Sequence, residues 1–311
     1  MTGSMELGGV IVPLTTPFAT DETIDFEAFS RQIEWMLAEG VDGVVVGGST
    51  GEGFALDEEE VFALSRRALD VVAGRVPVMT SIMADSSRAA MRRARQLSEL
   101  PLTGLQVAPP HYIFAPGDDG LVEFYSHVSG AADFPIVIYN VISWANVRPE
   151  LAVRIMDRVP QVRAVKQSDK DLGAFADLIL AVGGERVFGA IDGSLMSCYD
   201  LGAAGSIAAI ASAAPGANVS LWKAVRDDRR DQAQALNREL CNLWRFLAAP
   251  NLPARVKAAQ ILQGVPAGLP RSPMSAAPAD SETGLGDALR RLDACRRTGP
   301  AAEHVRLPLK D

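Results

Sequence analysis

The sequence predicts an α/β protein, a closed TIM (β/α)8 barrel with additional C-terminal helices. Short apolar runs rich in β-branched residues alternate with longer amphipathic stretches over about two thirds of the chain, and eight such runs can be counted. Eight strand-then-helix units close into a parallel barrel, because right-handed crossovers bury both faces of every strand, whereas six units favour an open sheet.

The expected strands and helices follow one another in regular order. The strands are residues 10–14, 43–46, 76–82, 104–108, 136–139, 162–166, 186–190 and 205–209. Amphipathic helices are expected between them at residues 26–39, 58–72, 87–100, 121–132, 149–158 and 172–182, most of them with apolar residues at three- and four-residue spacing. Helix starts support three of them: Asp25 before the first, Asp57 with Glu60 before the second, and Pro149 in the first turn of the fifth.

Further helices are expected beyond the barrel. Residues 215–262 carry apolar positions such as Trp222, Leu236 and Trp244, and residues 286–297 form one more charged helix. Residues 265–282 are rich in proline, alanine and serine and are expected to be a loose connection, and the last dozen residues are expected to be frayed. We therefore divide the chain into a barrel, residues 1–214, and a helical extension packed on it, residues 215–311.

Composition excludes several classes of function. The 311 residues are 48% hydrophobic and carry a formal charge of -8, so a substantial core is expected, and nucleic acid or a membrane surface is not an expected partner. Three scattered cysteines and three histidines form neither a disulfide framework nor a zinc ligand set, so we expect no metal and no cofactor. The start lacks a signal-peptide pattern and no apolar run reaches about 20 residues, which favours a cytoplasmic location.

Lys166 ends the sixth apolar run and directly precedes Gln167-Ser168-Asp169. The chemistry of a TIM barrel lies at the carboxyl ends of its strands, which is where this lysine is expected. Burial disfavours the ammonium form, so the neutral amine that attacks a carbonyl becomes accessible. The alternative is a lysine that simply leaves a strand and meets water.

Four other segments place polar groups at expected strand ends. They are Gly47-Gly48-Ser49-Thr50-Gly51-Glu52, Pro109-Pro110-His111-Tyr112, Tyr139-Asn140 and Gly189-Ala190-Ile191-Asp192-Gly193. Amides and hydroxyls of the first segment could cradle a carboxylate or a phosphate, or the segment could be a tight glycine turn. Tyr139 could relay protons beside Lys166, or it could cap the barrel core.

Six segments, taken together, resemble the dihydrodipicolinate synthase and N-acetylneuraminate lyase family of pyruvate-dependent class I aldolases. They are Pro13-x-x-Thr16-Pro17-Phe18, Gly48-Ser49-Thr50-Gly51-Glu52, Pro110-His111-Tyr112, Tyr139-Asn140, Val165-Lys166-Gln167 and Gly202-Ala203-Ala204-Gly205-Ser206-Ile207. Their order and spacing agree with the family from about residue 8 to residue 264. The resemblance implies a homotetramer or homodimer whose Lys166 forms a Schiff base with pyruvate or a pyruvate-derived 2-oxo acid.

The same resemblance implies roles for the neighbouring residues. Tyr139 would exchange protons with the substrate, and Thr50 would pass protons to Tyr139. Ser49 and Thr50, through their hydroxyls and backbone amides, would hold the pyruvoyl carboxylate, and Gly48 is expected to bind substrate beside them. In the synthase branch a tyrosine from the adjacent subunit completes the relay; we expect Tyr112 there, with His111 as the alternative.

Departures from the family pattern concern the second substrate. The synthase branch carries an arginine that grips the carboxylate of aspartate semialdehyde, and Trp144 stands in its place, where an indole cannot make the bidentate contact. The lyase branch has an Asp-Glu pair where this chain has Asp192-Gly193. Trp144 with Asn146 therefore favours a less anionic acceptor, although Trp144 could equally pack in a subunit interface. The expected substrate-binding set also includes residues of the last two strand ends, namely Gly189, Asp192 and Ile207.

The sequence thus predicts a Schiff-base lyase or aldolase that acts on a small 2-oxo acid and an aldehyde. Two alternatives use the same lysine: 4-hydroxy-tetrahydrodipicolinate synthase, and a dehydratase of 2-keto-3-deoxy sugar acids. A third is a barrel that binds a 2-oxo acid as a sensor without turning it over. The presence of Lys166, Tyr139 and Thr50 argues against a sensor, since a pure binder has no use for a proton relay.

Overall fold

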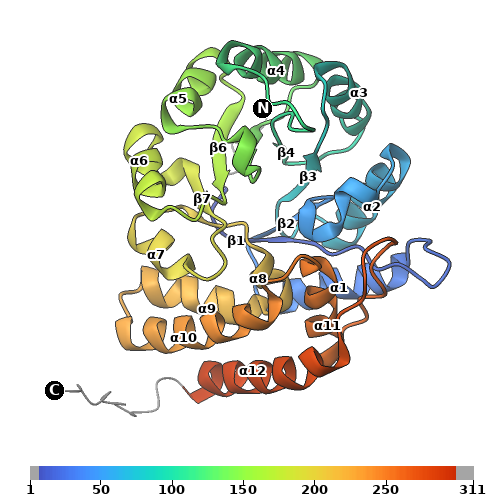
Figure 1. Cartoon of the computed structure of the whole chain (residues 1–311), viewed down its shortest axis with the longest axis vertical. Helices are drawn as coiled ribbons and strands as arrows, with labels where there is room; N and C mark the ends of the chain where they lie inside the picture. The colour runs from blue at the N-terminus through green and yellow to red at the C-terminus, as the bar shows by residue number, and fades with distance from the viewer. Residues whose placement is uncertain (1–6, 299–311) are drawn as a thin grey trace.

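Eight parallel strands form a closed barrel in the computed structural model, which describes residues 7–298. Each strand pairs with its neighbours in sequence, and β8 pairs with β1. The strands are β1 (Gly9–Pro13), β2 (Gly43–Val46), β3 (Val78–Ile82), β4 (Gly104–Val107), β5 (Ile136–Asn140), β6 (Val162–Gln167), β7 (Val187–Gly189) and β8 (Gly205–Ser206). Figure 1 shows the strands at the centre of a ring of helices. The predicted TIM barrel is confirmed.

Twelve α-helices are present in the described part of the chain. They are α1 (Phe26–Ala38), α2 (Glu58–Val72), α3 (Ser87–Leu97), α4 (Asp118–Ala131), α5 (Pro149–Arg158), α6 (Leu172–Val182), α7 (Leu195–Asp200), α8 (Ala209–Ala213), α9 (Pro215–Arg226), α10 (Arg230–Leu247), α11 (Leu252–Leu262) and α12 (Ala279–Thr298). The predicted starts are confirmed: Asp25 accepts from two amides of α1, Asp57 and Glu60 form a capping box on α2, and Pro149 is the first residue of α5.

The barrel interior changes from apolar to polar along its axis. One interior layer consists of Ile11, Val45, Met79, Val137, Ala164, Phe188 and Ile207. Successive side chains of a strand point to opposite faces, so the residue two positions after an interior residue also faces inward. In β3, β5 and β6 those next interior positions are Ser81, Tyr139 and Lys166, toward the carboxyl ends of the strands. The polar mouth of the barrel therefore lies on an apolar floor.

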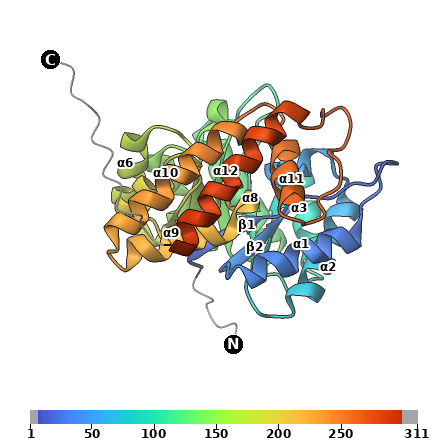
Figure 2. The same ribbon diagram turned by 90° about the horizontal axis from the view of Figure 1, so that it is seen from below.

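Helices α9 to α12 gather on one side of the barrel (Figure 1), and Figure 2 shows α12 lying across the outside of this group. A second apolar core holds them together, with Leu221, Leu236, Leu243, Val256 and Leu292 among its members. The division at residue 214 stays a prediction, because residues before it, such as Leu195 and Ile210, also belong to this core.

The structure differs from the sequence predictions at three places. Residues 205–209 were expected as one strand, but only Gly205 and Ser206 are in β8, because Ala209 already starts α8. Helix α7 was not expected. Residues 265–282 are not loose throughout: Val265 and Ala267 are buried, and α12 begins at Ala279. The predicted fraying of the last dozen residues lies outside the described part.

Candidate active site

Lys166 and Tyr139 lie side by side at the carboxyl mouth of the barrel. The two residues are paired in register on the adjacent strands β5 and β6. The Lys166 side chain is only 5% exposed, and its Nζ lies 4.1 Å from the centroid of the Tyr139 ring. Within residues 7–298 no carboxylate lies within ion-pair distance of Lys166, and its amine lies over an aromatic ring.

The Tyr139 hydroxyl reaches across the barrel to the turn after β2. It donates to Ser49 Oγ at 2.9 Å, and the Ser49 amide donates to the tyrosine oxygen at 3.3 Å. We expected this contact with Thr50. Ser49 and Thr50 are successive residues of the 3₁₀ turn η1 (Ser49–Gly51), so their side chains diverge, and the one that meets Tyr139 is Ser49. The predicted relay through Thr50, which is buried, stays a prediction.

The turn itself is built on close backbone approaches. A Cβ at Gly51 would lie 2.5 Å from the carbonyl oxygen of Leu14, so only glycine fits there. The Thr16 hydroxyl donates to the carbonyl of Gly51 at 2.7 Å, which ties the turn to the segment after β1. This contact gives a physical role to one residue of the Thr16-Pro17-Phe18 motif.

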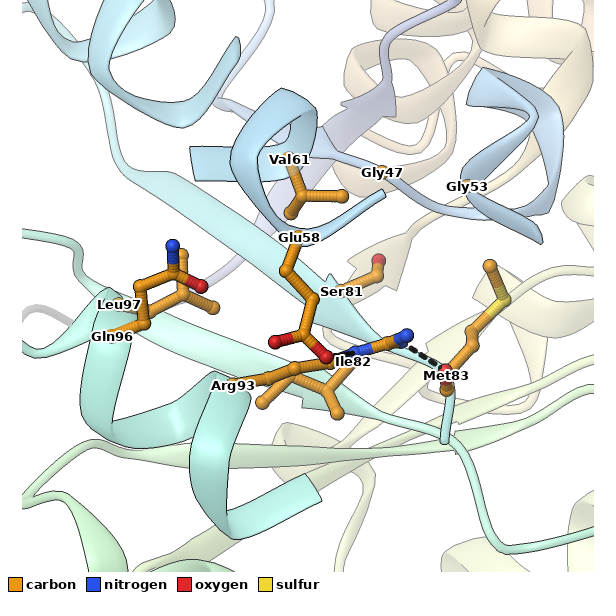
Figure 3. Close-up of a pocket in the computed structure, with 10 residues that line it drawn as sticks. All are labelled: Gly47, Gly53, Glu58, Val61, Ser81, Ile82, Met83, Arg93, Gln96 and Leu97. Carbon is orange, nitrogen blue, oxygen red and sulfur yellow. Dashed lines mark hydrogen bonds and ion pairs between the residues drawn. The ribbon is translucent and has the colours of Figure 1, made fainter. Parts of the chain in front are cut away.

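A small crevice backs the same turn from the outside of the barrel (Figure 3). Its volume of about 10 Å³ is room for one water molecule. Arg93 crosses it, contacting Glu58 at 3.1 Å and donating to the carbonyl of Met83. The pKa of Glu58 is lowered to about 2, chiefly by the hydrogen bond from Arg92 and also by Arg93. The sulfur of Met83, one of the residues that line the crevice, lies 3.9 Å from Ser49 Oγ, so the crevice wall contacts the turn.

Asp192 stands near Lys166 from the loop after β7. One carboxylate oxygen accepts from the Ile210 amide at 2.7 Å. The carboxyl keeps partial contact with solvent, yet its protein surroundings desolvate it and raise its pKa to about 6, which the charge of Lys166 partly opposes. Asp192 can therefore change protonation state near neutral pH.

Gly189 is the last residue of β7, and Ile207 directly follows β8. A Cβ on Gly189 would approach the Cys198 side chain to 2.8 Å, which explains the glycine by packing. Ile207 is fully buried in the apolar floor. Their predicted part in substrate binding stays a prediction.

A polar network shapes the loop after β5. Asn140 donates to Asn146 Oδ1 at 2.6 Å and to Gln167 Oε1 at 3.0 Å, and its own oxygen accepts from the Val147 amide. Asn146 in turn donates to Asp169 at 3.0 Å. Asn146, predicted to bind substrate, thus uses both ends of its amide to hold this loop, and a substrate contact would have to replace one of these bonds.

Trp144 contacts the residue before Tyr112, where the loops after β4 and β5 approach each other. The Trp144 side chain is 63% exposed, and its Nε1 donates to the carbonyl of His111 at 2.8 Å. Asp85 accepts from the amides of both His111 and Tyr112. Tyr112 is 73% exposed, and within residues 7–298 it forms no hydrogen bond with Tyr139 or Thr50.

Four residues of the site were missed at the sequence level: Ser81, Met83, Asp85 and Gln106. Asp85 follows β3 at its carboxyl end, and this position alone could have pointed to it. Gln106 is fully buried and donates to Ser81 Oγ at 2.9 Å, below Gly48 and the Tyr139 hydroxyl. A glutamine inside a barrel strand carries no such signal in the sequence.

Residues 7–298 contain neither a metal-binding cluster nor a membrane-spanning helix. In this range no group of three His, Cys, Asp or Glu side chains is placed to hold a metal ion. No helix of that range has the length and apolar character needed to cross a bilayer.

Comparisons with known proteins agree with this geometry. The family model "Dihydrodipicolinate synthetase family" matches residues 6–292. The 4-hydroxy-tetrahydrodipicolinate synthase of Thermomicrobium roseum is 34% identical, over 89% of this chain and 92% of that protein. Among solved structures, a putative dihydrodipicolinate synthetase from Pseudomonas aeruginosa has a TM-score of 0.87 at 29% identity, covering 92% of this chain and 99% of that one. YagE of E. coli K12, solved in complex with pyruvate, has a TM-score of 0.87 at 25% identity, with 93% and 99% covered. The chain therefore belongs to the dihydrodipicolinate synthetase family of class I, lysine-dependent aldolases and lyases.

Proposed function

We propose that Lys166 forms a Schiff base with the keto carbon of pyruvate or a pyruvate-derived 2-oxo acid. The observation that carries the proposal is the buried amine of Lys166, held against Tyr139 without an ion-pair partner among residues 7–298. A lysine amine that no carboxylate engages is available as a nucleophile toward a carbonyl carbon. The structure of YagE with pyruvate supports the choice of 2-oxo acid.

The proposed reaction starts at Lys166. Lys166 Nζ adds to the keto carbon and water leaves, giving a protonated imine. Loss of a proton from the adjacent carbon gives an enamine, which adds to the carbonyl carbon of an aldehyde, and water then releases the product from the lysine. Tyr139 moves the protons, and its hydrogen bond with Ser49 couples it to the turn that holds the substrate carboxylate. The reverse direction, retro-aldol cleavage, uses the same groups.

We further propose that the acceptor aldehyde lacks the carboxylate of aspartate semialdehyde. Trp144 stands on the 3₁₀ turn η3 (Ser143–Ala145) where the synthase branch of the family carries its arginine. The nearest substitute by sequence, Arg148, is mostly exposed and donates to Asp118 at 2.8 Å, so its guanidinium is already engaged. A dehydration reaction through the same enamine stays an alternative.

The second candidate is 4-hydroxy-tetrahydrodipicolinate synthase. The names of the relatives at 33 and 34% identity favour it. The two candidates share Lys166 and Tyr139 and differ only in the acceptor.

A homo-oligomer completes the proposal. The exposed apolar side chains Tyr112, Ile113 and Phe114 form one loop after β4, and Ile113 has a φ of +61°, which is unusual for a β-branched residue. We propose that this loop packs against a second copy and delivers Tyr112 to the partner's relay. A cytoplasmic location remains an expectation.

Reduction with borohydride in the presence of pyruvate tests the Schiff base. The wild-type protein should gain the mass of one reduced pyruvate adduct, and peptide mapping should place it on Lys166. Lys166→Ala should gain no mass, whereas Lys170→Ala, which removes an exposed lysine four residues on, should behave as wild type. An adduct that persists in Lys166→Ala would refute the assignment.

A panel of aldehydes, assayed with Trp144→Arg beside the parent, tests the acceptor. A guanidinium at this position should raise activity with aspartate semialdehyde at least about tenfold, since a bidentate contact with a carboxylate is among the stronger charged contacts. Ser143→Arg places the same charge one residue earlier on the same exposed turn and serves as the control. Equal responses of the two variants would remove Trp144 from the acceptor pocket, and efficient use of aspartate semialdehyde by the parent would favour the second candidate.

A further inference from the structure

A second lysine, Lys257, is buried between the C-terminal helices and the barrel. It lies on α11, is 1% exposed, and donates to Glu52 Oε1 at 2.6 Å and to the carbonyl of Leu269 at 2.6 Å. Burial lowers the pKa of the Lys257 amine, and the Glu52 carboxylate acts in the opposite direction. The ion pair joins residues that are 205 positions apart in the sequence.

Glu52 directly follows the Ser49–Gly51 turn. It is fully buried and adopts a left-handed backbone with a φ of +56°, a conformation that costs free energy in a residue other than glycine. Its second oxygen, Oε2, accepts from the Arg271 amide at 2.9 Å. Both carboxylate oxygens are therefore held by the segment that follows the barrel, Lys257 from α11 and Arg271 from the connection to α12.

Phe18 provides a platform beneath these cations. The Lys257 Nζ lies 4.7 Å and the Arg271 guanidinium 4.2 Å from the centroid of its ring. The guanidinium of Arg271 also donates to the carbonyl of Ala55 and to the Glu60 carboxylate. With Thr16 bound to the carbonyl of Gly51, the turn is fixed on one side by the segment after β1 and on the other by the C-terminal extension.

We propose that the Glu52–Lys257 ion pair is a positioning device, through which the C-terminal helices set the conformation of the turn that binds the carboxylate of the 2-oxo acid. Neither residue touches the substrate. Desolvation offsets most of the attraction within a buried ion pair, so net stabilisation alone does not explain this one. Its location beside the turn instead favours a role in positioning the turn. The inference rests on the proposed function, which assigns the turn to that carboxylate.

The uncharged double variant Glu52→Gln/Lys257→Met tests the inference. Gln keeps an acceptor for the Arg271 amide and Met fills the volume of the lysine stem, so the variant removes the ion pair without leaving a lone buried charge. The carboxylate is bound in both ground and transition states, so a displaced turn should raise KM for the 2-oxo acid about tenfold or more and leave kcat within about threefold. KM for the aldehyde should not change, and the pyruvate concentration for half-maximal borohydride trapping should rise in parallel.

Arg255→Met is the matched control. Arg255 is a cation on the same helix, and it donates to the carbonyl of Phe246, away from the turn. This variant should keep the wild-type KM and trapping concentration.

Three outcomes separate the positioning role of the ion pair from the proposed function. A rise in KM and in trapping concentration in the double variant alone supports the inference. Wild-type values in a folded double variant, or equal changes in Arg255→Met, overturn it. Absence of trapping in the wild type would instead refute the proposed function, and that result is separate because it does not involve the ion pair.

Discussion

The barrel mouth and the junction between barrel and C-terminal helices each bury one lysine, and the two lysines have opposite surroundings. Lys257 is enclosed by a carboxylate and a carbonyl oxygen, each 2.6 Å from its amine. Lys166 faces the ring of Tyr139 and has no ion-pair partner in residues 7–298. The two amines therefore differ in their contacts: Lys257 donates to two oxygen atoms, whereas the Lys166 amine lies over an aromatic ring.

Both lysines are buried, so burial alone does not distinguish the proposed nucleophile from a lysine held in an ion pair. What distinguishes the two regions is the set of oxygen acceptors around the amine. The same two regions are also linked, because Lys257 acts on the turn that faces Lys166 across the barrel.

The largest effect is expected from removal of Lys166. Lys166→Met should lower kcat by about 10⁴-fold or more, because the covalent route is lost. Its melting temperature should not fall, since no ion pair in the described residues is broken. Steady-state assays and thermal unfolding measure the two quantities, and a large loss of stability would contradict the contrast with Lys257.

The reverse pattern is expected for Lys257. Lys257→Met leaves Glu52 as a buried charge without its partner and should lower the free energy of unfolding by about 3–5 kcal/mol. Adding Glu52→Gln should recover most of that loss, because it removes the lone charge. Urea unfolding of the single and double variants measures both steps. If both variants were as stable as the wild type, the ion pair would be well solvated, contrary to its burial in the structure.

Tyr139→Phe separates proton transfer from Schiff-base formation at the barrel mouth. Loss of the hydroxyl should lower kcat by about 10²- to 10³-fold, within the range for general acid–base catalysis, while Lys166 can still be trapped with pyruvate. Tyr125→Phe is the control, because it removes a buried hydroxyl that donates to the carbonyl of Val107, on the helix side of the barrel wall. A fall in kcat of similar size in the control would point to general loosening of the barrel.

The smallest expected effect is a pH-dependent change in folding stability when Asp192 is replaced. Its carboxyl has an ordinary pKa of 3.8 and a pKa of about 6 in the folded protein, so the folded state holds the proton more tightly between these values. Its favourable contribution to stability is present below about pH 4 and is lost as the pH rises to about 6, at most about 3 kcal/mol because the group keeps some contact with solvent. Asp192→Asn should therefore be more stable than wild type at pH 8 and not at pH 4.

Melting temperatures from pH 4 to 8 measure this difference. Asp157→Asn, an exposed change of the same charge on α5, should show no such trend. A difference that does not vary with pH would place the Asp192 carboxyl in a well-solvated environment.

The sequence was sufficient for the barrel and for the position of Lys166 at the end of β6, and insufficient for the links between distant segments. Strands β1 to β6 were predicted to within about two residues, because doubly buried parallel strands appear as continuous apolar runs. Strand β8 has only two residues, too few for such a run, and the helix after it starts at once. Lys166 could be recognised because it closes a run of this kind and belongs to a family pattern.

Lys257 had no comparable signal. It lies on a helix among alanines and a valine, and its partner Glu52 is far away in the sequence. The contact of the Tyr139 hydroxyl with Ser49 rather than Thr50 depends on the direction of side chains in a turn, which composition does not specify. The contact between Trp144 and the carbonyl of His111 likewise depends on how two loops meet.

The platform at Phe18 has a consequence for protein engineering. Its ring supports two cations that come from the last third of the polypeptide, while its backbone carbonyl accepts from the Leu269 amide. A chimera that joins this barrel to the tail of a relative would separate these partners unless residues 18, 52, 257 and 271 are transplanted as one set. Recombination within the family should therefore tolerate a crossover before residue 18 or after residue 271 better than any crossover between residues 52 and 257.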